Sequence, residues 1–131
     1  MANEITTRCS LTVALTGSTL THDTTKQFSI DTAYERVSDV LACTTSMAAI
    51  DLGSIDPVTE LTELWLYNAG AAAVTVQAYK SGGSPEEFSL TTIPAGGVNL
   101  INPALDTGYS LRAAIASGTG NLFFFAVGAH A

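Results

Sequence analysis

The chain has 131 residues, of which 47% are hydrophobic and only 13% are charged, and its net charge at pH 7 is −7. This length suits one domain with a single core, and the charged fraction is about half of the ~25% found in typical soluble domains. DNA binding depends on Lys and Arg neutralising phosphates, so five basic residues scattered along an acidic chain argue against a direct nucleic-acid partner.

The low charge is unusual for a free soluble domain. The non-core positions are filled by Thr, Ser, Ala, Gly and Asn instead. Because charged residues are depleted at the centres of protein interfaces, we interpret the composition as a sign that neighbouring subunits cover much of the surface. The alternative is a monomer with a neutral, hydroxyl-rich surface.

The first predicted element is a strand close to the N-terminus. Apolar residues occupy the odd positions from Ile5 to Leu15, with polar residues between them, and this period of two is typical of a half-buried strand. We expect the odd side to face the core and residues 1–7 to be able to extend as an N-terminal arm. The Thr-rich residues 19–26 predict a loop or a weak edge strand, and the alternation around Phe28 and Ile30 predicts another short strand.

The next segment is the one place where a helix competes with a strand. Ala33, Val37 and Leu41 are spaced by four, but the segment as far as Thr45 is rich in β-branched and small residues, so we favour a strand. Residues 47–52 predict a further short strand, and residues 53–57 predict a loop.

Four acidic residues lie within thirteen positions in and around this loop, namely Asp51, Asp56, Glu60 and Glu63. A calcium site is one interpretation, but the spacing does not match the twelve-residue EF-hand loop. A solvated acidic loop is the interpretation that we favour, because exposed carboxylates are ordinary at protein surfaces.

Residues 64–93 contain the strongest β signal. Two β-rich runs flank a turn that contains Asn68 and Gly70, and a third run follows the Gly-rich residues 80–84. Asn and Gly tolerate the positive φ of tight turns, so this pattern predicts a three-stranded antiparallel meander with residues 80–84 as a mobile hairpin tip.

Strands are also predicted at residues 98–101, 109–115 and 122–127, with turns between them. The last run, like residues 64–67, is apolar on both faces, so it must be covered on one side by the opposing sheet and on the other by another element or subunit. About eight to ten short strands at this spacing predict an all-β, single-domain antiparallel β-sandwich spanning residues 1–131, with a jelly roll or a closely related topology.

Catalytic and ligand-binding patterns are missing from the sequence. His22 and Asp23 are adjacent and would point apart on a strand, and His130 has no partner at metal-ligand spacing. No nucleophile, base and orienting group can be named together, so we expect neither an enzyme nor a metal or other cofactor. Cys9 and Cys43 could form a disulfide, but reduced, buried cysteines are more common in a chain without a secretory signal.

The N-terminus has neither a basic region nor an apolar region of the kind that begins a secretory signal. The longest apolar run has six residues, which is too short to cross a bilayer. These two features predict synthesis in the cytoplasm and no membrane partner.

Aromatic residues offer one binding hypothesis. Trp65, Tyr67 and Tyr79 could present flat rings to a saccharide, as in a sugar-binding sandwich. Because Trp65 and Tyr67 alternate with leucines in a strand that we expect to be central, a core position or a protein interface is the interpretation that we favour.

Several segments together resemble the small β-sandwich virion proteins of tailed bacteriophages. The resemblance covers residues 3–127 and lies in strand and turn patterns. These are the opening Met-Ala-Asn-Glu-Ile-Thr before an alternating strand, Leu-x-Leu-x-Asn-x-Gly…Val-Thr-Val, Ile-Pro-Ala-Gly-Gly-Val-Asn-Leu and Ser-Gly-Thr-Gly-Asn-Leu.

This resemblance implies a non-enzymatic structural subunit of a virion, assembled in the host cytoplasm. Within the class, a capsid decoration or cement protein that binds the major capsid protein is the leading expectation, as a homo-oligomer and most simply a trimer. A tail, neck or head-fibre subunit, or a receptor- or glycan-binding module, is the alternative. The residues expected at subunit contacts are those of the N-terminal arm together with apolar residues of two later strands, namely Ile5, Trp65, Tyr67, Phe123 and Phe125.

Overall fold

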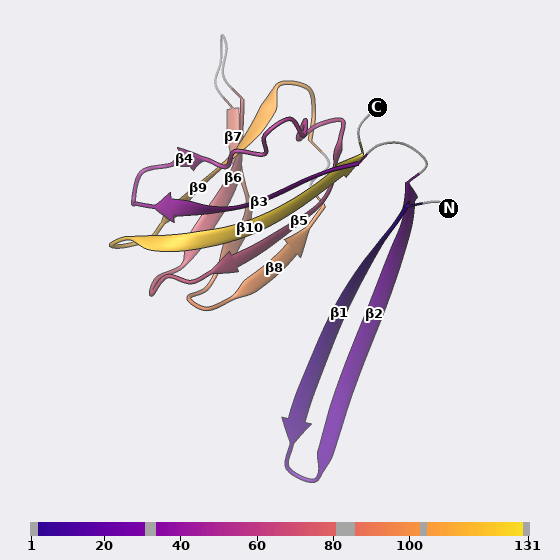
Figure 1. The fold of residues 1–131 in the computed structure, drawn as a ribbon. Coiled ribbons are helices and arrows are strands. Elements are labelled where there is room, and N and C mark those ends of the chain that lie inside the picture. Colours follow the sequence, from indigo (N-terminus) through magenta and orange to yellow (C-terminus); the bar gives the residue numbers. More distant parts are fainter. Residues whose placement is uncertain (1–2, 31–33, 81–85, 103–104, 130–131) are drawn as a thin grey trace. The chain divides into compact units, whose positions relative to one another are not determined.

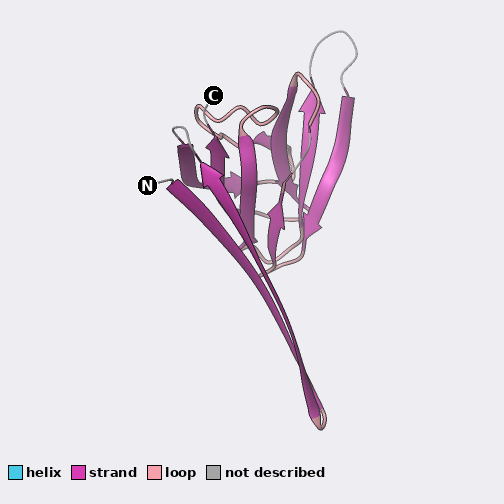
Figure 2. Ribbon diagram, turned by 90° about the vertical axis from the view of Figure 1, so that its right-hand side faces the viewer, coloured by secondary structure: helices cyan, strands magenta, loops and turns pink. Residues whose placement is uncertain are grey.

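A computed structural model describes residues 3–30, 34–80, 86–102 and 105–129. The described residues contain ten strands and no helix (Figure 2). They therefore contain no helix that could cross a membrane. The chain divides into two compact units, Met1–Ala33 and Tyr34–Ala131.

The first unit is a two-stranded antiparallel sheet made of β1 (Asn3–Leu15) and β2 (Ser18–Ile30). The strands stay in register along their whole length, from Leu15 opposite Ser18 to Asn3 opposite Ile30. Gly17 takes a φ of 87° in the turn, a conformation that glycine adopts without a steric penalty.

Two details of this unit differ from the prediction. Residues 19–26, expected as a loop or a weak edge strand, lie within the long strand β2, and residues 28–30 continue that strand. Residues 3–7, considered as an arm, are paired with β2. The Thr-rich composition explains the difference, since β-branched Thr favours strands even where apolar alternation is weak.

The second unit is a sandwich of two four-stranded sheets (Figure 1). The strands in chain order are β3 (Tyr34–Cys43), β4 (Ala48–Ala49), β5 (Leu61–Asn68), β6 (Val74–Lys80), β7 (Glu86–Ile93), β8 (Val98–Ile101), β9 (Tyr109–Ile115) and β10 (Gly120–Ala129). One sheet has the order β3-β10-β5-β8 and the other has the order β4-β9-β6-β7. Residues 33–41, where a helix competed with a strand, are extended from Tyr34 onward, as predicted.

The topology of the second unit is a jelly roll. When the eight strands are counted inward from both ends, the first pairs with the last, the second with the second-to-last, and so on. The antiparallel pairs are β3 with β10, β4 with β9, β5 with β8 and β6 with β7. Alternate pairs belong to opposite sheets, and the pairings of β10 with β5 and of β9 with β6 complete each sheet. Eight strands wrapped in this way form the double-sheet jelly roll, which confirms the predicted fold class.

The predicted meander over residues 64–93 is wrong in its first half. β5 pairs with β10 and β8 rather than with β6, so residues 69–73 carry the chain from one sheet to the other. The hairpin of β6 and β7 is present as predicted, although its tip, residues 81–85, lies outside the described residues.

Asn68 is the physical reason for this crossing. Its side chain is fully buried, and Nδ2 donates to the carbonyl oxygens of Ala72 (2.8 Å), Ile93 (3.0 Å) and Pro94 (3.1 Å). Its Oδ1 accepts from the backbone N–H of Gly70 at 2.9 Å. The Asn-x-Gly motif thus fixes an arch between sheets by bonding to the next turn as well as to its own.

The core lies between the two sheets of the sandwich. Leu64, Leu66, Leu122 and Phe124 face inward from one sheet. The other sheet meets them with fully or almost fully buried residues, namely Val74, Val76, Ala78, Ile93, Leu111, Ala113 and Ile115. Buried and half-buried residues alternate strictly along the first part of β6. Val74, Val76 and Ala78 are buried, and Thr75 and Gln77 between them are half-buried.

Cys43 is a free, buried cysteine at the end of β3. Burial raises the pKa of its thiol. In a Cys9→Ser variant, which leaves Cys43 as the single thiol, we expect a thiol reagent at pH 8 to react about 100-fold more slowly with the folded chain than with the chain in denaturant, because reaction requires local opening. Equal rates in the two conditions would contradict this prediction.

Candidate interaction surface

The outer face of the β3-β10-β5-β8 sheet carries two rows of apolar residues. The strand register sets Val40, Phe123, Tyr67 and Val98 side by side in one row. The next row holds Ser38, Phe125, Trp65 and Leu100. We call six of the exposed or half-exposed members the aromatic face, namely Val40, Trp65, Tyr67, Val98, Phe123 and Phe125.

The members of the aromatic face are substantially open to solvent. Trp65 is 38% exposed, Phe123 39% and Phe125 38%, and Val98 on the edge strand is 57% exposed. Their neighbours in sequence, Leu64, Leu66, Leu122 and Phe124, are buried in the core. Alternate residues of a strand face opposite sides, so the runs in β5 and β10 that are apolar on both faces place one aromatic set outside the sandwich.

Three of the four rings of the aromatic face form two close pairs. The ring centroids of Trp65 and Tyr67 lie 6.3 Å apart with the planes 29° from parallel, and those of Tyr67 and Phe123 lie 6.0 Å apart. These separations are within the range of favourable aromatic pairs. No ionised side chain stands in either row, so the rings lie on a surface without a fixed charge.

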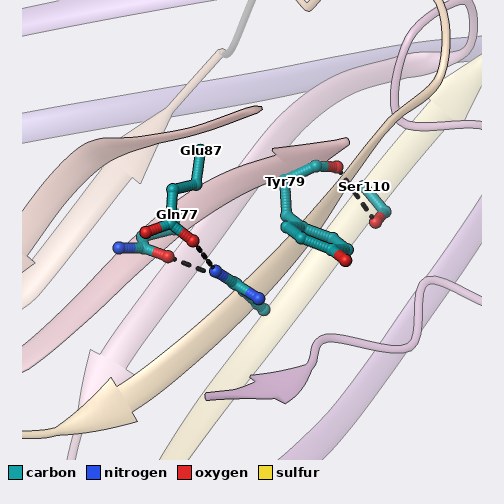
Figure 3. Close-up of polar contacts among 5 residues, drawn as sticks. Gln77, Tyr79, Glu87 and Ser110 are labelled. Carbon is teal, nitrogen blue, oxygen red and sulfur yellow. Dashed lines mark hydrogen bonds and ion pairs between the residues drawn. The ribbon is translucent and has the colours of Figure 1, made fainter. Parts of the chain in front are cut away.

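The outer face of the opposite sheet is polar. Arg112 on β9 donates from Nε to Oε1 of Gln77 at 3.1 Å, forms an ion pair with Glu87 and lies over the ring of Tyr79 (Figure 3). Ser110 donates to the backbone oxygen of Tyr79 at 3.4 Å. Here the aromatic ring is covered by a cation and its neighbours are hydrogen-bonded, so the apolar character of the aromatic face is specific to one side of the sandwich.

Four of the five residues predicted at subunit contacts lie together. Trp65, Tyr67, Phe123 and Phe125 come from neighbouring strands and share one surface. The idea that Trp65 could belong to the core is wrong, because its indole is on the outer face. Ile5 lies in β1 opposite Phe28, in the other unit, and its side chain is outside the described residues.

Sequence reasoning missed Val40 and Val98, which extend the row of Phe123 and Tyr67 at both ends. Val40 lies between the exposed Asp39 and the half-buried Leu41, and Val98 lies between the half-buried Gly97 and Asn99. Alternation alone could have placed them on an outer face, but only the register shows that this is the same face as the rings.

The acidic segment after β4 uses its carboxylates within the loop. Asp51 accepts from the backbone N–H of Gly53 at 2.9 Å, Asp56 accepts from that of Val58 at 2.7 Å, and Glu60 accepts from that of Asp56 at 2.9 Å. No cluster of three potential metal ligands occurs among the residues that the structure describes. These carboxylates therefore have a structural role in shaping the loop.

An open pocket of about 370 Å³ lies beside this loop and is lined by residues 49–53, Ile55, Pro57, Ser110 and Leu111. A small-molecule site normally combines apolar walls with several convergent polar side chains. In this pocket the two polar side chains of the lining are already hydrogen-bonded, Asp51 to the loop backbone and Ser110 to the backbone oxygen of Tyr79. The aromatic face is therefore the stronger candidate for function.

Comparisons with known proteins add no further assignment. No protein-family model matches the chain, and no curated protein matches its sequence.

Proposed function

We propose that this chain is a non-enzymatic structural subunit that assembles through its aromatic face. The observation that carries the proposal is the uncharged surface of Trp65, Tyr67, Phe123 and Phe125 on one side of a sandwich whose other side is polar. Contiguous exposed apolar patches on soluble proteins commonly mark interaction sites, and aromatic residues are enriched at the centres of interfaces.

The setting that we propose is a tailed-phage virion, with a capsid decoration or cement protein as the most specific role. The resemblance of the strand and turn patterns to small virion β-sandwich proteins supports this role. The jelly roll is a fold used by viral capsid domains, although the same fold also serves lectins and other proteins. The low charged fraction supports extensive contacts with other subunits.

The mechanism of such a subunit is mass action rather than chemistry. A subunit that binds only the assembled shell stabilises it by RT ln(1 + [L]/Kd) for each site, which is about 2.7 kcal/mol when the free concentration is 100 times Kd. The partners are copies of the same chain, with a trimer favoured, and the major capsid protein or another virion subunit. Tail, neck and head-fibre positions use the same mechanism and are the nearest alternatives within this class.

A receptor- or glycan-binding module is the second candidate, and the exposure of Trp65 and Tyr67 is the observation that favours it. Flat rings can stack on sugars, but recognition of hydroxyl groups also needs convergent hydrogen-bonding side chains. The two rows offer only Ser38, the hydroxyl of Tyr67 and the indole N–H of Trp65 for that purpose. The surface chemistry therefore favours an apolar protein partner.

We expect Phe123→Lys to weaken self-association by about 30-fold or more, because removal of a central aromatic anchor costs at least about 2 kcal/mol in many interfaces. Size-exclusion chromatography with light scattering over a range of concentrations measures this change. Thr92→Lys is the matched control, since Thr92 is exposed on the opposite sheet and the variant adds the same charge.

Co-sedimentation of the same two variants with tail-less capsids of the parent phage tests the virion role, and a glycan array tests the second candidate. Loss of capsid binding in Phe123→Lys alone would support decoration. A wild-type chain that remains monomeric at all concentrations and does not bind particles would overturn the proposal, and saturable binding to a glycan would replace it with the second candidate.

A further inference from the structure

We propose that Asp39 closes the outer edge of β3 against pairing with the β3 strand of a second copy. The inference goes beyond the proposed function, because it concerns an edge of the sandwich and not the aromatic face. Among the described residues, each four-stranded sheet ends in two strands that pair on one side only, β3 and β8 in one sheet and β4 and β7 in the other. The free N–H and C=O groups of such edges can pair with a strand of another chain.

Three of these four edges are poor templates for a further strand. β4 has two residues and β8 has four, and short edge strands offer few hydrogen bonds. β7 has eight residues, but its register with β6 shifts between Val76 and Gln77, and such an irregularity disrupts a ladder. β3 has ten residues and pairs with β10 without a shift. It is therefore the long, regular edge of the described sandwich.

Asp39 lies in the core-facing row of this edge strand. It is opposite Phe124 of β10, and directly opposite residues of antiparallel strands lie on the same face of a sheet. Phe124 is buried, and Val37 and Leu41, on either side of Asp39 in the same row, pack against the core. Asp39 is nevertheless exposed. A charged residue that points inward from an edge strand hinders the addition of another strand, because the added strand would cover the charge.

The Asp39 carboxylate also occupies a hydrogen-bond donor of the backbone. The N–H of Val40 donates to Oδ1 of Asp39 at 2.8 Å. Because alternate N–H groups of an antiparallel strand point to the same side, those of Ser38 and Ala42 belong to the same edge as that of Val40. A strand added at this edge would have to displace the carboxylate in order to pair with the Val40 N–H.

The symmetry of a β3–β3 contact makes that displacement costly. A two-fold axis that joins two identical edges keeps the core-facing row of each copy on the same side of the combined sheet. Asp39 would then be opposite another member of that row, which is Val37, Leu41, Cys43 or Asp39 of the second copy among the described positions. None of these side chains is cationic, so the carboxylate would be covered without a compensating charge.

The first test removes the carboxylate from the full-length chain. We expect Asp39→Ala to raise the association constant at least about tenfold over that of the wild type, because the edge loses both its charge and the group bonded to Val40. Asp106→Ala is the matched control, since it removes the same charge from an exposed loop position and should change the constant by less than about threefold. Sedimentation velocity over a range of concentrations gives these values.

The second test locates the contact. Asp39→Ala/Val40→Pro removes the edge N–H as well, and proline is tolerated on edge strands where its nitrogen faces outward. We expect association of this double variant to return to within about threefold of the wild type. In Asp39→Ala itself, amide hydrogen exchange at Ser38 and Ala42 should slow by at least about tenfold between dilute and concentrated samples, because both N–H groups become hydrogen-bonded.

Three results would overturn the inference. The first is equal association of Asp39→Ala and Asp106→Ala, which would show an effect of net charge or no effect. The second is increased association that persists in the double variant, and the third is increased association without slower exchange at Ser38 and Ala42. Either of these would place the contact elsewhere. Phe123→Lys tests the aromatic face separately, so failure at the β3 edge would leave the proposed function in place.

Discussion

Replacing Asn68 by Asp is expected to lower the free energy of unfolding by about 3–5 kcal/mol, the range seen when a buried charge is left unpaired. The wild-type Nδ2 faces three carbonyl oxygens at 2.8–3.1 Å, and the new carboxylate would face the same three oxygens with no proton to donate. Urea unfolding followed by circular dichroism measures the loss, and the melting temperature should fall by more than about 10 °C.

Acid should partly restore the Asn68→Asp variant. The surrounding oxygens favour the protonated carboxyl in the folded state, whereas in the unfolded chain an Asp has its ordinary pKa of about 3.9. The folded pKa therefore lies above the unfolded one. The difference in stability between wild type and variant should shrink as the pH falls toward 4 and reach its full size once the pH exceeds the folded pKa.

Asn121→Asp is the matched control for this prediction. Asn121 is exposed, so the same chemical change should alter stability by less than about 0.5 kcal/mol. A loss of that small size in Asn68→Asp would show that the arch after β5 does not depend on the amide, contrary to our account.

Asn68 also shows where sequence reasoning succeeds and where it stops. The Asn-x-Gly pattern correctly predicts a turn after residue 68, but a hairpin within one sheet and an arch between two sheets use the same local residues. The distinction lies in Ile93 and Pro94, more than twenty positions away, whose carbonyls receive the amide protons. No local pattern contains that information.

The strands themselves were largely predictable because alternation is a local property. β6 and β9 coincide closely with the predicted runs, and the jelly-roll topology follows once they are paired. The predicted strand at residues 47–52 is shorter, with only Ala48 and Ala49 paired, because the next residues turn into the Asp51 loop. β2 is longer than predicted because Thr supports a strand without an apolar pattern.

The candidate surface was predictable in chemistry but not in extent. A run such as Leu122–Val127, apolar at every position, requires a cover on both sides, and the structure leaves Phe123 and Phe125 on the outside. That Trp65 and Tyr67 lie beside them follows from the pairing of β5 with β10, a long-range contact. The sequence therefore indicates which residues need a partner, and the register shows that they form one surface.

Gly128→Ala is expected to destabilise the sandwich by about 3 kcal/mol, at the upper end for an overpacked site. A Cβ at this position would lie 2.7 Å from Cγ2 of Ile55 and 2.8 Å from the backbone oxygen of Glu60. Gly128 follows the register shift between β10 and β5, so relief of the clash must move either the acidic loop or the end of β10. Urea unfolding measures the loss of stability.

The effect should extend to the aromatic face, because Phe123 and Phe125 lie on the same strand as Gly128. We expect weaker self-association of Gly128→Ala in light scattering even below the denaturation midpoint. Gly118→Ala is the control, since a Cβ there meets no atom within 4 Å but the φ of 69° disfavours alanine by about 1 kcal/mol. If Gly128→Ala lowered the free energy of unfolding by no more than Gly118→Ala does, the backbone of the acidic loop would have to move without an energetic cost. The close packing of β10 against Glu60 would then not fix the end of the strand.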